Sequence, residues 1–382
     1  MQLTDLTDAL SLTRQMIDIP SVSGQEGPLA DAVEAAVRSA GFGSVPALEI
    51  LRDGEAVCAR TRLGLPQRVV LAGHLDTVPI ADNVPGRTEI RDGVEVVWGR
   101  GSVDMLGGCA AALALACEVG PLIAAGEHAA LTADVTWIFY DHEEVASHLN
   151  GLGRIERNHP QWLAGDLALL GEPTAAHVEG GCNGTLRVIA RFPGRAAHSA
   201  RAWMGVNAIH AMAPVIERIA DYGNPVELVD GLEFRESLSV VRVEGGIANN
   251  VIPEAASMTV NYRFAPSKRA DDALAWVRSL FEGTGATIEV DDLCEGARPG
   301  ADSPVAERFL TVARRIAAEQ GTELRLSAKV GWTDVARFTQ VGVPAMNFGP
   351  GDPLLAHTRD EHAPVSDIVR VHDTLRAFVL VH

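Results

Sequence analysis

The chain has 382 residues, 47% of them hydrophobic and 21% charged, a balance that excludes a disordered polar chain. At roughly 150 residues per domain, this length predicts two or three domains. Its 32 basic and 50 acidic residues leave a formal net charge of -18, which argues against nucleic acid or an anionic membrane as the main partner.

The cysteines and the N-terminus indicate the compartment. Five cysteines with no Cys-x-x-Cys pair are typical of reduced thiols rather than of a disulfide framework. The first residues lack the unbroken apolar core of a signal peptide, and no run approaches the ~18 apolar residues of a membrane-spanning helix. We therefore expect a cytoplasmic protein that does not span a membrane.

The first 177 residues predict alternating helices and short strands. Apolar residues at helical spacing predict helices at residues 3–17 and 27–40. Short β-branched runs then alternate with alanine-rich helical stretches, which is typical of a covered, mostly parallel sheet. The predicted strands are residues 68–72, 94–98, 135–140 and 167–170, and a clear intervening helix is residues 108–119.

The pattern changes after about residue 178. From there to residue 290 the sequence predicts a compact β-α-β-β-α unit, after which the alternating pattern resumes. The simplest interpretation is an α/β catalytic domain, residues 1–177 and 291–382, interrupted by an inserted α+β two-layer sandwich, residues 178–290. The predicted elements are strands 185–192, 238–243 and 257–264 with helices 207–222 and 270–281 inside the insertion, and helix 303–320, strand 343–348 and helix 366–379 after it.

Residue types that bind metals follow the predicted strands. Ligands of open α/β sheets bind beyond the carboxyl ends of the strands, so these residues are expected to meet at one edge. A single histidine or glutamate at the end of a strand is usually an ordinary polar residue. Several strands that each end at a histidine or carboxylate together predict a metal site. The residues are His74 and Asp76, then Asp104, the pair Glu143 and Glu144, Glu172, and His357.

The composition of this set indicates the metal chemistry. Histidine and carboxylate ligands without a thiolate suit zinc, cobalt or manganese in a hydrolytic site. Two histidines and three carboxylates exceed what one catalytic zinc binds, but they suit two metals that share a bridging carboxylate. His74 and Asp76 point to the same side of an extended segment, so the Asp76 side chain can accept the second ring N–H of His74. In the pair Glu143–Glu144, one side chain can bind metal while the other faces the water.

The same motifs carry a resemblance to a known family. The sequence resembles the di-zinc metallopeptidases that include aminoacylases, glutamate carboxypeptidases, acetylornithine deacetylases and succinyl-diaminopimelate desuccinylases, and the resemblance covers essentially the whole chain. Within the family it is most similar to the desuccinylases of actinobacterial type, through motifs such as residues 197–201 (AHSAR) and 331–334 (GWTD). The motifs of the wider family are residues 73–79 (GHLDTVP), 99–105 (GRGSVDM), 143–144 (EE), 171–174 (GEPT) and His357.

The resemblance implies a role for each of these residues. Asp76 would orient His74, and Glu143 would be the general base. A cis peptide bond is expected after Asp104. Two zinc ions would be bound, with cobalt or manganese as possible substitutes. The ligands would be His74 and Glu172 for one ion, Glu144 and His357 for the other, and Asp104 as the bridge between them.

The resemblance also implies functions for the inserted domain. This domain would act as a lid and form the interface of a homodimer. His198 would then reach the active site of the partner subunit as a catalytic group. Asn249, Asn250 and Arg263 would contact the substrate.

The expected reaction is hydrolysis of an amide in a small, acidic N-acyl amino acid. A hydroxide that bridges the two metals would attack the carbonyl carbon, while Glu143 takes the proton and passes it to the leaving amine. One zinc and His198 would stabilise the oxyanion, and Arg263 would clamp a carboxylate. The resemblance favours removal of succinate from N-succinyl-LL-2,6-diaminopimelate, in lysine and diaminopimelate biosynthesis.

Other interpretations stay open. Leu106 stands where many relatives have lysine, and Cys182–Asn183 stand where some bacterial desuccinylases carry two arginines, so the groups that bind the substrate carboxylates are undetermined. An alternative substrate is another N-acyl amino acid, as in an acetylornithine deacetylase, a dipeptidase or a carboxypeptidase. A metal-binding module without catalysis is a third interpretation, and the presence of Glu143 with all five ligands argues against it.

Overall fold

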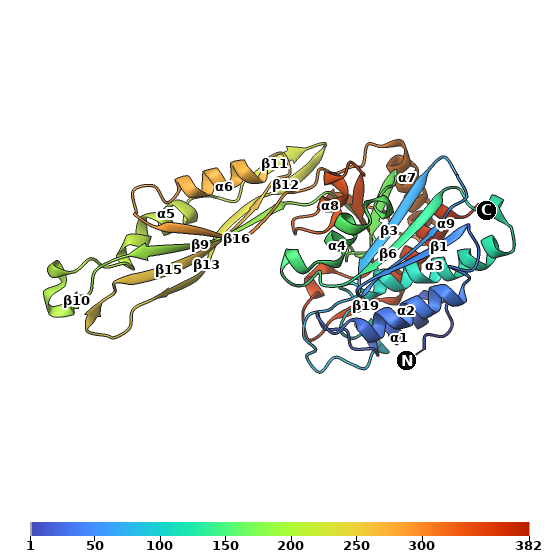
Figure 1. The fold of residues 1–382 in the computed structure, drawn as a ribbon, viewed down its shortest axis with the longest axis horizontal. Helices are drawn as coiled ribbons and strands as arrows, with labels where there is room; N and C mark the ends of the chain where they lie inside the picture. Colours follow the sequence, from blue (N-terminus) through green and yellow to red (C-terminus); the bar gives the residue numbers. More distant parts are fainter. Residues whose placement is uncertain (1, 382) are drawn as a thin grey trace. The chain divides into compact units, whose positions relative to one another are not determined.

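The structure is a computed structural model, and it describes residues 2–381. The chain forms two compact units. The first, which we call the main unit, contains the chain up to Gly180, Gly300–Ser327 and the chain from Arg337 onward. The second, the inserted unit, contains Gly181–Pro299 and Ala328–Ala336 and so interrupts the main unit in sequence (Figure 1).

A mixed sheet of eight strands forms the centre of the main unit. Strands β6 (Asp134–Tyr140), β3 (Arg68–His74), β7 (Leu167–Leu170) and β18 (Ala345–Asn347) lie next to one another in this order and run parallel. They are almost wholly buried, as central strands covered on both faces are, which confirms the predicted α/β class. The full order is β1-β2-β6-β3-β7-β18-β8-β17, with β1 (Leu48–Asp53), β2 (Ala56–Thr61), β8 (Val178–Gly180) and β17 (Leu326–Ala328).

Helix α3 (Leu106–Ala124) forms the core of the main unit. It contacts α1 (Ala9–Ile17), α2 (Gly27–Ser39), α9 (Val365–Val379) and strand β3. Among the helices of residues 2–381, it alone is long and apolar enough to cross a membrane, and its burial on nearly all sides accounts for this composition. The other helices outside residues 181–299 are α4 (Gly151–Asn158), α7 (Pro304–Glu319) and α8 (Val335–Gln340).

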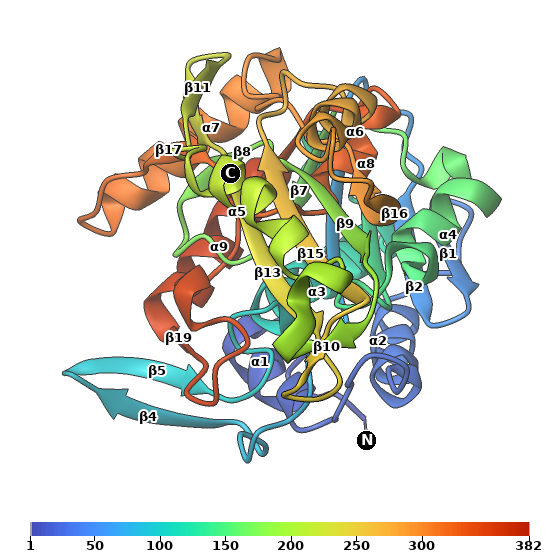
Figure 2. The same cartoon turned by 90° about the vertical axis from the view of Figure 1, so that its left-hand side faces the viewer.

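One predicted strand lies outside the main sheet. Strand β5 (Val94–Trp98) pairs with β4 (Arg87–Arg91) and β19 (His362–Pro364) in a separate antiparallel sheet (Figure 2). The prediction that residues 94–98 belong to the parallel set was wrong, because Asp92 and Gly93 form a two-residue hairpin turn with positive φ angles. Asp104 therefore follows a hairpin strand and precedes α3, and no strand of the main sheet ends at it.

The inserted unit is a four-stranded antiparallel sheet with two helices packed against it, which is the predicted α+β sandwich. Buried residues alternate along β15 (Ala255–Phe264), and they pack against α5 (Ala213–Ala220) and α6 (Ala270–Ser279). Helix α5 is shorter than the predicted helix 207–222, because Pro214 favours the first turn of a helix. The order is β13-β15-β9-β16, with β13 (Ser237–Gly245), β9 (Gly184–Pro193) and β16 (Thr287–Cys294); β10 (Ala197–His198) pairs with β14 (Val251–Ile252), and β11 (Val226–Val229) with β12 (Leu232–Arg235).

Candidate metal centre

The predicted metal ligands all belong to the main unit and meet at one end of its sheet. His74 is the last residue of β3, Glu144 follows β6 and Glu172 follows β7, so neighbouring parallel strands deliver them to the same edge. Asp104 lies in the turn before α3, and His357 lies in the loop after a short helical turn that ends at Leu355. Residues distant in sequence thus form one cluster.

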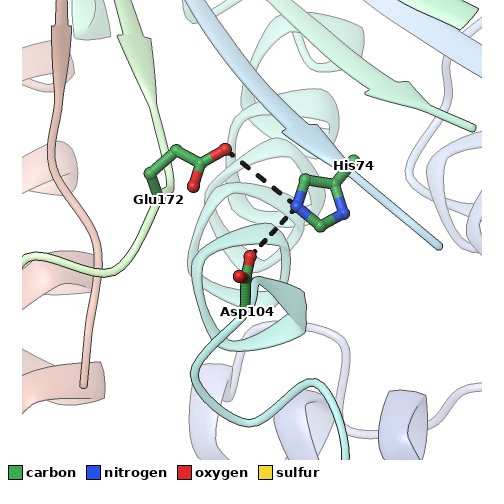
Figure 3. A group of neighbouring side chains, drawn as sticks. All are labelled: His74, Asp104 and Glu172. Atoms are coloured by element: carbon green, nitrogen blue, oxygen red, sulfur yellow. Dashed lines mark hydrogen bonds and ion pairs between the residues drawn. The ribbon is translucent and has the colours of Figure 1, made fainter. Parts of the chain in front are cut away.

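His74, Asp104 and Glu172 form the first group of potential ligands (Figure 3). His74 Nε2 lies 3.1 Å from Asp104 Oδ1 and 4.0 Å from Glu172 Oε1. Figure 3 shows both carboxylates directed at this one ring nitrogen. The three ligand atoms lie within 4.8 Å of one another, which brings them near enough to share one ion.

Asp104, Glu144 and His357 form the second group. His357 Nε2 lies 2.9 Å from Glu144 Oε1 and 3.2 Å from Asp104 Oδ2. Asp104 therefore directs Oδ1 at the first group and Oδ2 at the second, as a carboxylate shared by two ions does. His357 has a φ angle of 64°, a left-handed conformation that is uncommon for residues other than glycine and is concentrated at functional sites.

The hydrogen bonds of His74 determine which ring nitrogen faces the carboxylates. Nδ1 lies 2.9 Å from the backbone carbonyl oxygen of Asp76 and donates to it, so Nε2 is the ring nitrogen that faces the carboxylates. A ring nitrogen that faces two carboxylates can bind a cation held between them, so this set fits a divalent metal. The acceptor differs from the predicted one, because the Asp76 side chain lies 3.6 Å from Nδ1, beyond hydrogen-bond reach.

The Asp76 carboxylate instead holds the turn that contains Glu143 and Glu144. Its Oδ1 accepts the backbone N–H of Glu143 at 2.9 Å, and its Oδ2 accepts that of Glu144 at 3.0 Å. The Ser23 hydroxyl also donates to Oδ2, at 2.7 Å. Ser23 was not predicted, since its link to the site is a backbone pairing with Thr77 that only the fold creates.

The cluster concentrates negative charge, and its pKa shifts reflect this. Burial lowers the pKa of His74, but Asp104 and two further carboxylates outweigh burial and raise it well above its usual value. Hydrogen bonds to Asp104 and Glu144 raise the pKa of His357 to about 10. Burial raises the pKa of Asp104, but His357 and His74 lower it more, and the net shift is downward. The site therefore stabilises added positive charge, which divalent ions supply.

A thiol lies beside the cluster but is no competing ligand. Cys109 Sγ donates to the backbone carbonyl oxygen of His74 at 3.2 Å. Burial raises the pKa of Cys109 to about 12, so the sulfur stays protonated at neutral pH. The potential ligands are therefore histidine and carboxylate alone, which is the set that zinc, cobalt and manganese accept in hydrolytic sites.

The remaining predicted site residues lie in the inserted unit. His198 ends β10, is exposed, and accepts the backbone N–H of Ala200 on Nδ1 at 3.1 Å. The loop of Asn249 and Asn250 lies beside it, because the Asn250 carbonyl oxygen accepts the N–H that follows His198 at 2.9 Å. Arg263 is partly buried in β15, and within residues 2–381 its guanidinium has no hydrogen bond or ion pair.

Two histidines and several carboxylates gathered at one edge of a mostly parallel strand set, in a chain interrupted by an α+β insertion, are typical of a metal-dependent hydrolase. Comparison with known proteins gives the particular family. The chain belongs to peptidase family M20/M25/M40, whose model matches residues 70–381. The predicted resemblance is confirmed, and so is the expectation of a cis peptide bond between Asp104 and Met105.

The relatives cover both units. A protein of Mycobacterium tuberculosis named as a succinyl-diaminopimelate desuccinylase is 48% identical over 372 residues, which are 97% of this chain and 98% of that one. The succinyl-diaminopimelate desuccinylase of Corynebacterium glutamicum is 45% identical over 98% of this chain and 96% of its own. Among solved structures, an M20 metallo-carboxypeptidase of Sulfolobus solfataricus has the same fold, with a TM-score of 0.78 at 16% identity over 97% of this chain and 98% of that one.

Proposed function

We propose that this protein hydrolyses the amide bond of N-succinyl-LL-2,6-diaminopimelate and releases succinate and LL-2,6-diaminopimelate, in lysine and diaminopimelate biosynthesis. One observation carries the proposal: relatives named for this reaction are 48% and 45% identical over nearly the whole chain. Identity of this extent covers the inserted unit as well as the main unit.

The cluster of the main unit is proposed to bind two zinc ions. Two imidazoles and three carboxylates without a thiolate support this choice, and cobalt and manganese accept the same ligands. Bound divalent ions supply a Lewis acid for the amide carbonyl and a water that loses a proton near neutral pH. The proposed ligands are His74 and Glu172 for one ion, Glu144 and His357 for the other, and Asp104 for both.

Glu143 is the residue proposed to transfer the proton. The Asp76 carboxylate accepts the backbone N–H of Glu143. The side chain of Glu143 forms a third group of close polar atoms with His74 and Glu144. As a general base it removes a proton from the attacking water, and as a general acid it then protonates the leaving amine. Asp76 accepts the backbone N–H groups of both adjacent glutamates, of which Glu143 is the proposed base and Glu144 the proposed ligand.

The inserted unit is proposed to bind the substrate. A net charge of -18 repels an acidic substrate at long range, so positive charge has to be supplied locally. Arg263 supports this role, because its guanidinium lacks a hydrogen bond or ion pair within residues 2–381, and a guanidinium can bind a substrate carboxylate through two hydrogen bonds. His198 would stabilise the oxyanion, with Asn249 and Asn250 as further substrate contacts.

The proposal includes a homodimer formed through the inserted unit, in which His198 serves the partner's active site. It also includes a cytoplasmic location. None of the five cysteines, all within the described residues, forms a disulfide, and reduced thiols agree with that compartment.

Activity of metal-stripped protein tests the function directly. We expect none without metal, and recovery that saturates at two zinc ions per chain. With N-succinyl-LL-2,6-diaminopimelate, kcat/KM is expected to exceed that with N-acetylornithine by at least about 100-fold, since a site built for a carboxylate rejects an acyl group that lacks it. Faster hydrolysis of N-acetylornithine would overturn the substrate, and full activity without metal would overturn the chemistry.

Glu143→Gln is the matched control, because it keeps all five proposed ligands and the size of the side chain. It is expected to bind two zinc ions with unchanged affinity while kcat falls by at least about 100-fold, the usual contribution of a general base. A Glu143→Gln protein with normal turnover would show that another group removes the proton.

A further inference from the structure

A buried ion pair in the main unit, Arg100–Glu361, has no part in the mechanism above. Glu361 is fully buried and Arg100 is 4% exposed. Arg100 donates from one guanidinium nitrogen to Glu361 Oε2 at 2.5 Å. A charged pair removed from water gains little for stability unless further hydrogen bonds satisfy both groups. The partners of these further bonds therefore indicate what the pair does.

Glu361 holds the loop that ends at Asp104. Its Oε1 accepts three backbone N–H groups, from Gly101 at 2.9 Å and from Val103 and Asp104 at 3.1 Å. Gly101 has a φ angle of 85°, and this left-handed residue allows the loop to curl around the carboxylate. The backbone of the residue that faces both ligand groups is thus fixed by one buried side chain.

Arg100 connects the same loop to the one that contains His357. It donates to the carbonyl oxygen of Thr358 at 3.2 Å and to that of Pro79 at 3.1 Å. Thr358 follows His357 directly, and the Glu361 backbone carbonyl accepts the N–H of the residue before Arg100 at 3.0 Å. The loop that ends at Asp104 and the loop that contains His357 are therefore joined by these hydrogen bonds. The side chains of the two residues lie 3.2 Å apart.

We propose that Arg100 and Glu361 are positioning residues of the metal centre, which hold Asp104 and His357 at the separation that the second ion requires. This inference rests on the proposed function, since it takes both residues as ligands. The location of the bonds carries this inference, because they go to the two loops that contain Asp104 and His357. All side-chain bonds of Glu361 go to residues 100–104.

Two substitutions test the pair in different ways. Glu361→Gln replaces one oxygen with an amide nitrogen that cannot accept, so either a loop N–H or Arg100 loses its partner. Arg100→Lys keeps the charge, but a single ammonium cannot reach three acceptors that lie in different directions. Arg100→Lys also serves if Glu361→Gln fails to fold.

Asp134→Asn is the matched control. Asp134 is 3% exposed, begins β6, and accepts the backbone N–H groups of Leu63, Gly64 and Leu65 at 2.9–3.1 Å. Arg68 lies 3.5 Å from its carboxylate. It is thus a buried carboxylate that holds a loop beside an arginine, but at the end of β6 opposite to the metal centre.

The experiment measures zinc affinity of metal-stripped protein by competition with a chelating dye, together with Tm, kcat and KM. In Glu361→Gln and Arg100→Lys, the weaker zinc is expected to bind about 10- to 100-fold less tightly, as for other groups that support metal ligands. We expect kcat to fall at least about tenfold with KM within about threefold. In Asp134→Asn, Tm falls, but zinc affinity and kcat stay within about twofold of wild type.

Wild-type zinc affinity and kcat in Glu361→Gln or Arg100→Lys would overturn the inference, and so would an equal loss of affinity in Asp134→Asn. Failure of the proposed function looks different: the wild-type protein would then bind zinc without hydrolysing the N-succinyl substrate. The affinity measurement needs no substrate and still tests the positioning role in that case.

Discussion

Arg263 shows how a residue proposed to bind the substrate can lower stability in the absence of substrate. Burial lowers its pKa, and the nearby Asp292 acts in the opposite direction. A partly buried cation without a hydrogen-bond partner costs free energy, unless a ligand supplies the partner. Arg187, on the neighbouring strand β9, is in contrast partly exposed and ion-paired with Asp291.

Substitution of Arg263 by methionine separates these two effects. We expect kcat/KM for N-succinyl-LL-2,6-diaminopimelate to fall about 10- to 100-fold, because a hydrogen bond to a charged group contributes about 1.5–3 kcal/mol. Tm is expected to stay the same or rise, since the unpaired charge is removed. Arg187→Met, which breaks a partly exposed ion pair, should change kcat/KM by less than about threefold. A lower Tm with unchanged kcat/KM would assign Arg263 a structural role instead.

At the scale of elements, the position of Glu172 depends on close contact between α3 and the end of β7. A Cβ atom on Gly108 of α3 would lie 2.1 Å from the carbonyl oxygen of Gly171, the residue before Glu172. Only glycine allows this approach of helix backbone to loop backbone. The position of Glu172, a proposed metal ligand, thus depends on the absence of a side chain at Gly108 of α3.

Gly108→Ala is therefore expected to destabilise the protein by about 1–3 kcal/mol, the usual cost of overpacking. Helix propensity alone would give the opposite sign, a gain of up to about 1 kcal/mol. Gly27→Ala in α2 is the control, because its Cβ would meet only the flexible Glu55 side chain at 3.5 Å. For both variants, the change in stability is measured from the midpoint of urea unfolding, with the slope of the transition unchanged. Equal midpoints for the two variants would contradict the packing argument.

Elements with a local signal could be predicted from the sequence, and long-range contacts could not. The buried strands β3, β6 and β7 show continuous apolar runs that stop at polar residues, and these runs located His74, Glu144 and Glu172. The hairpin of β4 and β5 had a signal in Asp92–Gly93 that the prediction did not use. The partners of Asp76 and Glu361 had none, because a carboxylate that accepts backbone N–H groups from another segment leaves no pattern in sequence.

At the scale of the whole molecule, β13 is an edge strand of the inserted sheet that carries exposed apolar side chains. Val243 is 50% exposed and Val241 is 58% exposed. Edge strands with unpaired backbone groups and apolar side chains pair with other chains unless they are blocked. A second copy that pairs with β13 about a two-fold axis would cover this edge, which supports the proposed homodimer.

Sedimentation velocity tests this assembly. The wild-type protein is expected to sediment as a dimer of 40.5 kDa chains. Val243→Glu should give monomers, because a two-fold interface contains the same residue from both subunits. The substitution therefore introduces two negative charges into the interface. Leu228→Glu on β11 is the control: Leu228 is 70% exposed but lies outside the four-stranded sheet, so the dimer should persist. A wild-type protein that is monomeric and fully active would rule out the homodimer. It would also rule out the proposed role of His198 in the partner's active site.

The order in which the chain is synthesised gives α3 a further consequence. Its partners α1 and α2 precede it, but α9 follows the entire inserted unit. During translation from the N-terminus, α3 therefore leaves the ribosome long before α9 exists to cover it. A helix apolar enough to be mistaken for a membrane segment is then exposed while the insertion is made, and surface of this kind is what molecular chaperones bind. The inserted unit, which we propose to bind the substrate, thus also prolongs the period in which the nascent chain is prone to aggregate.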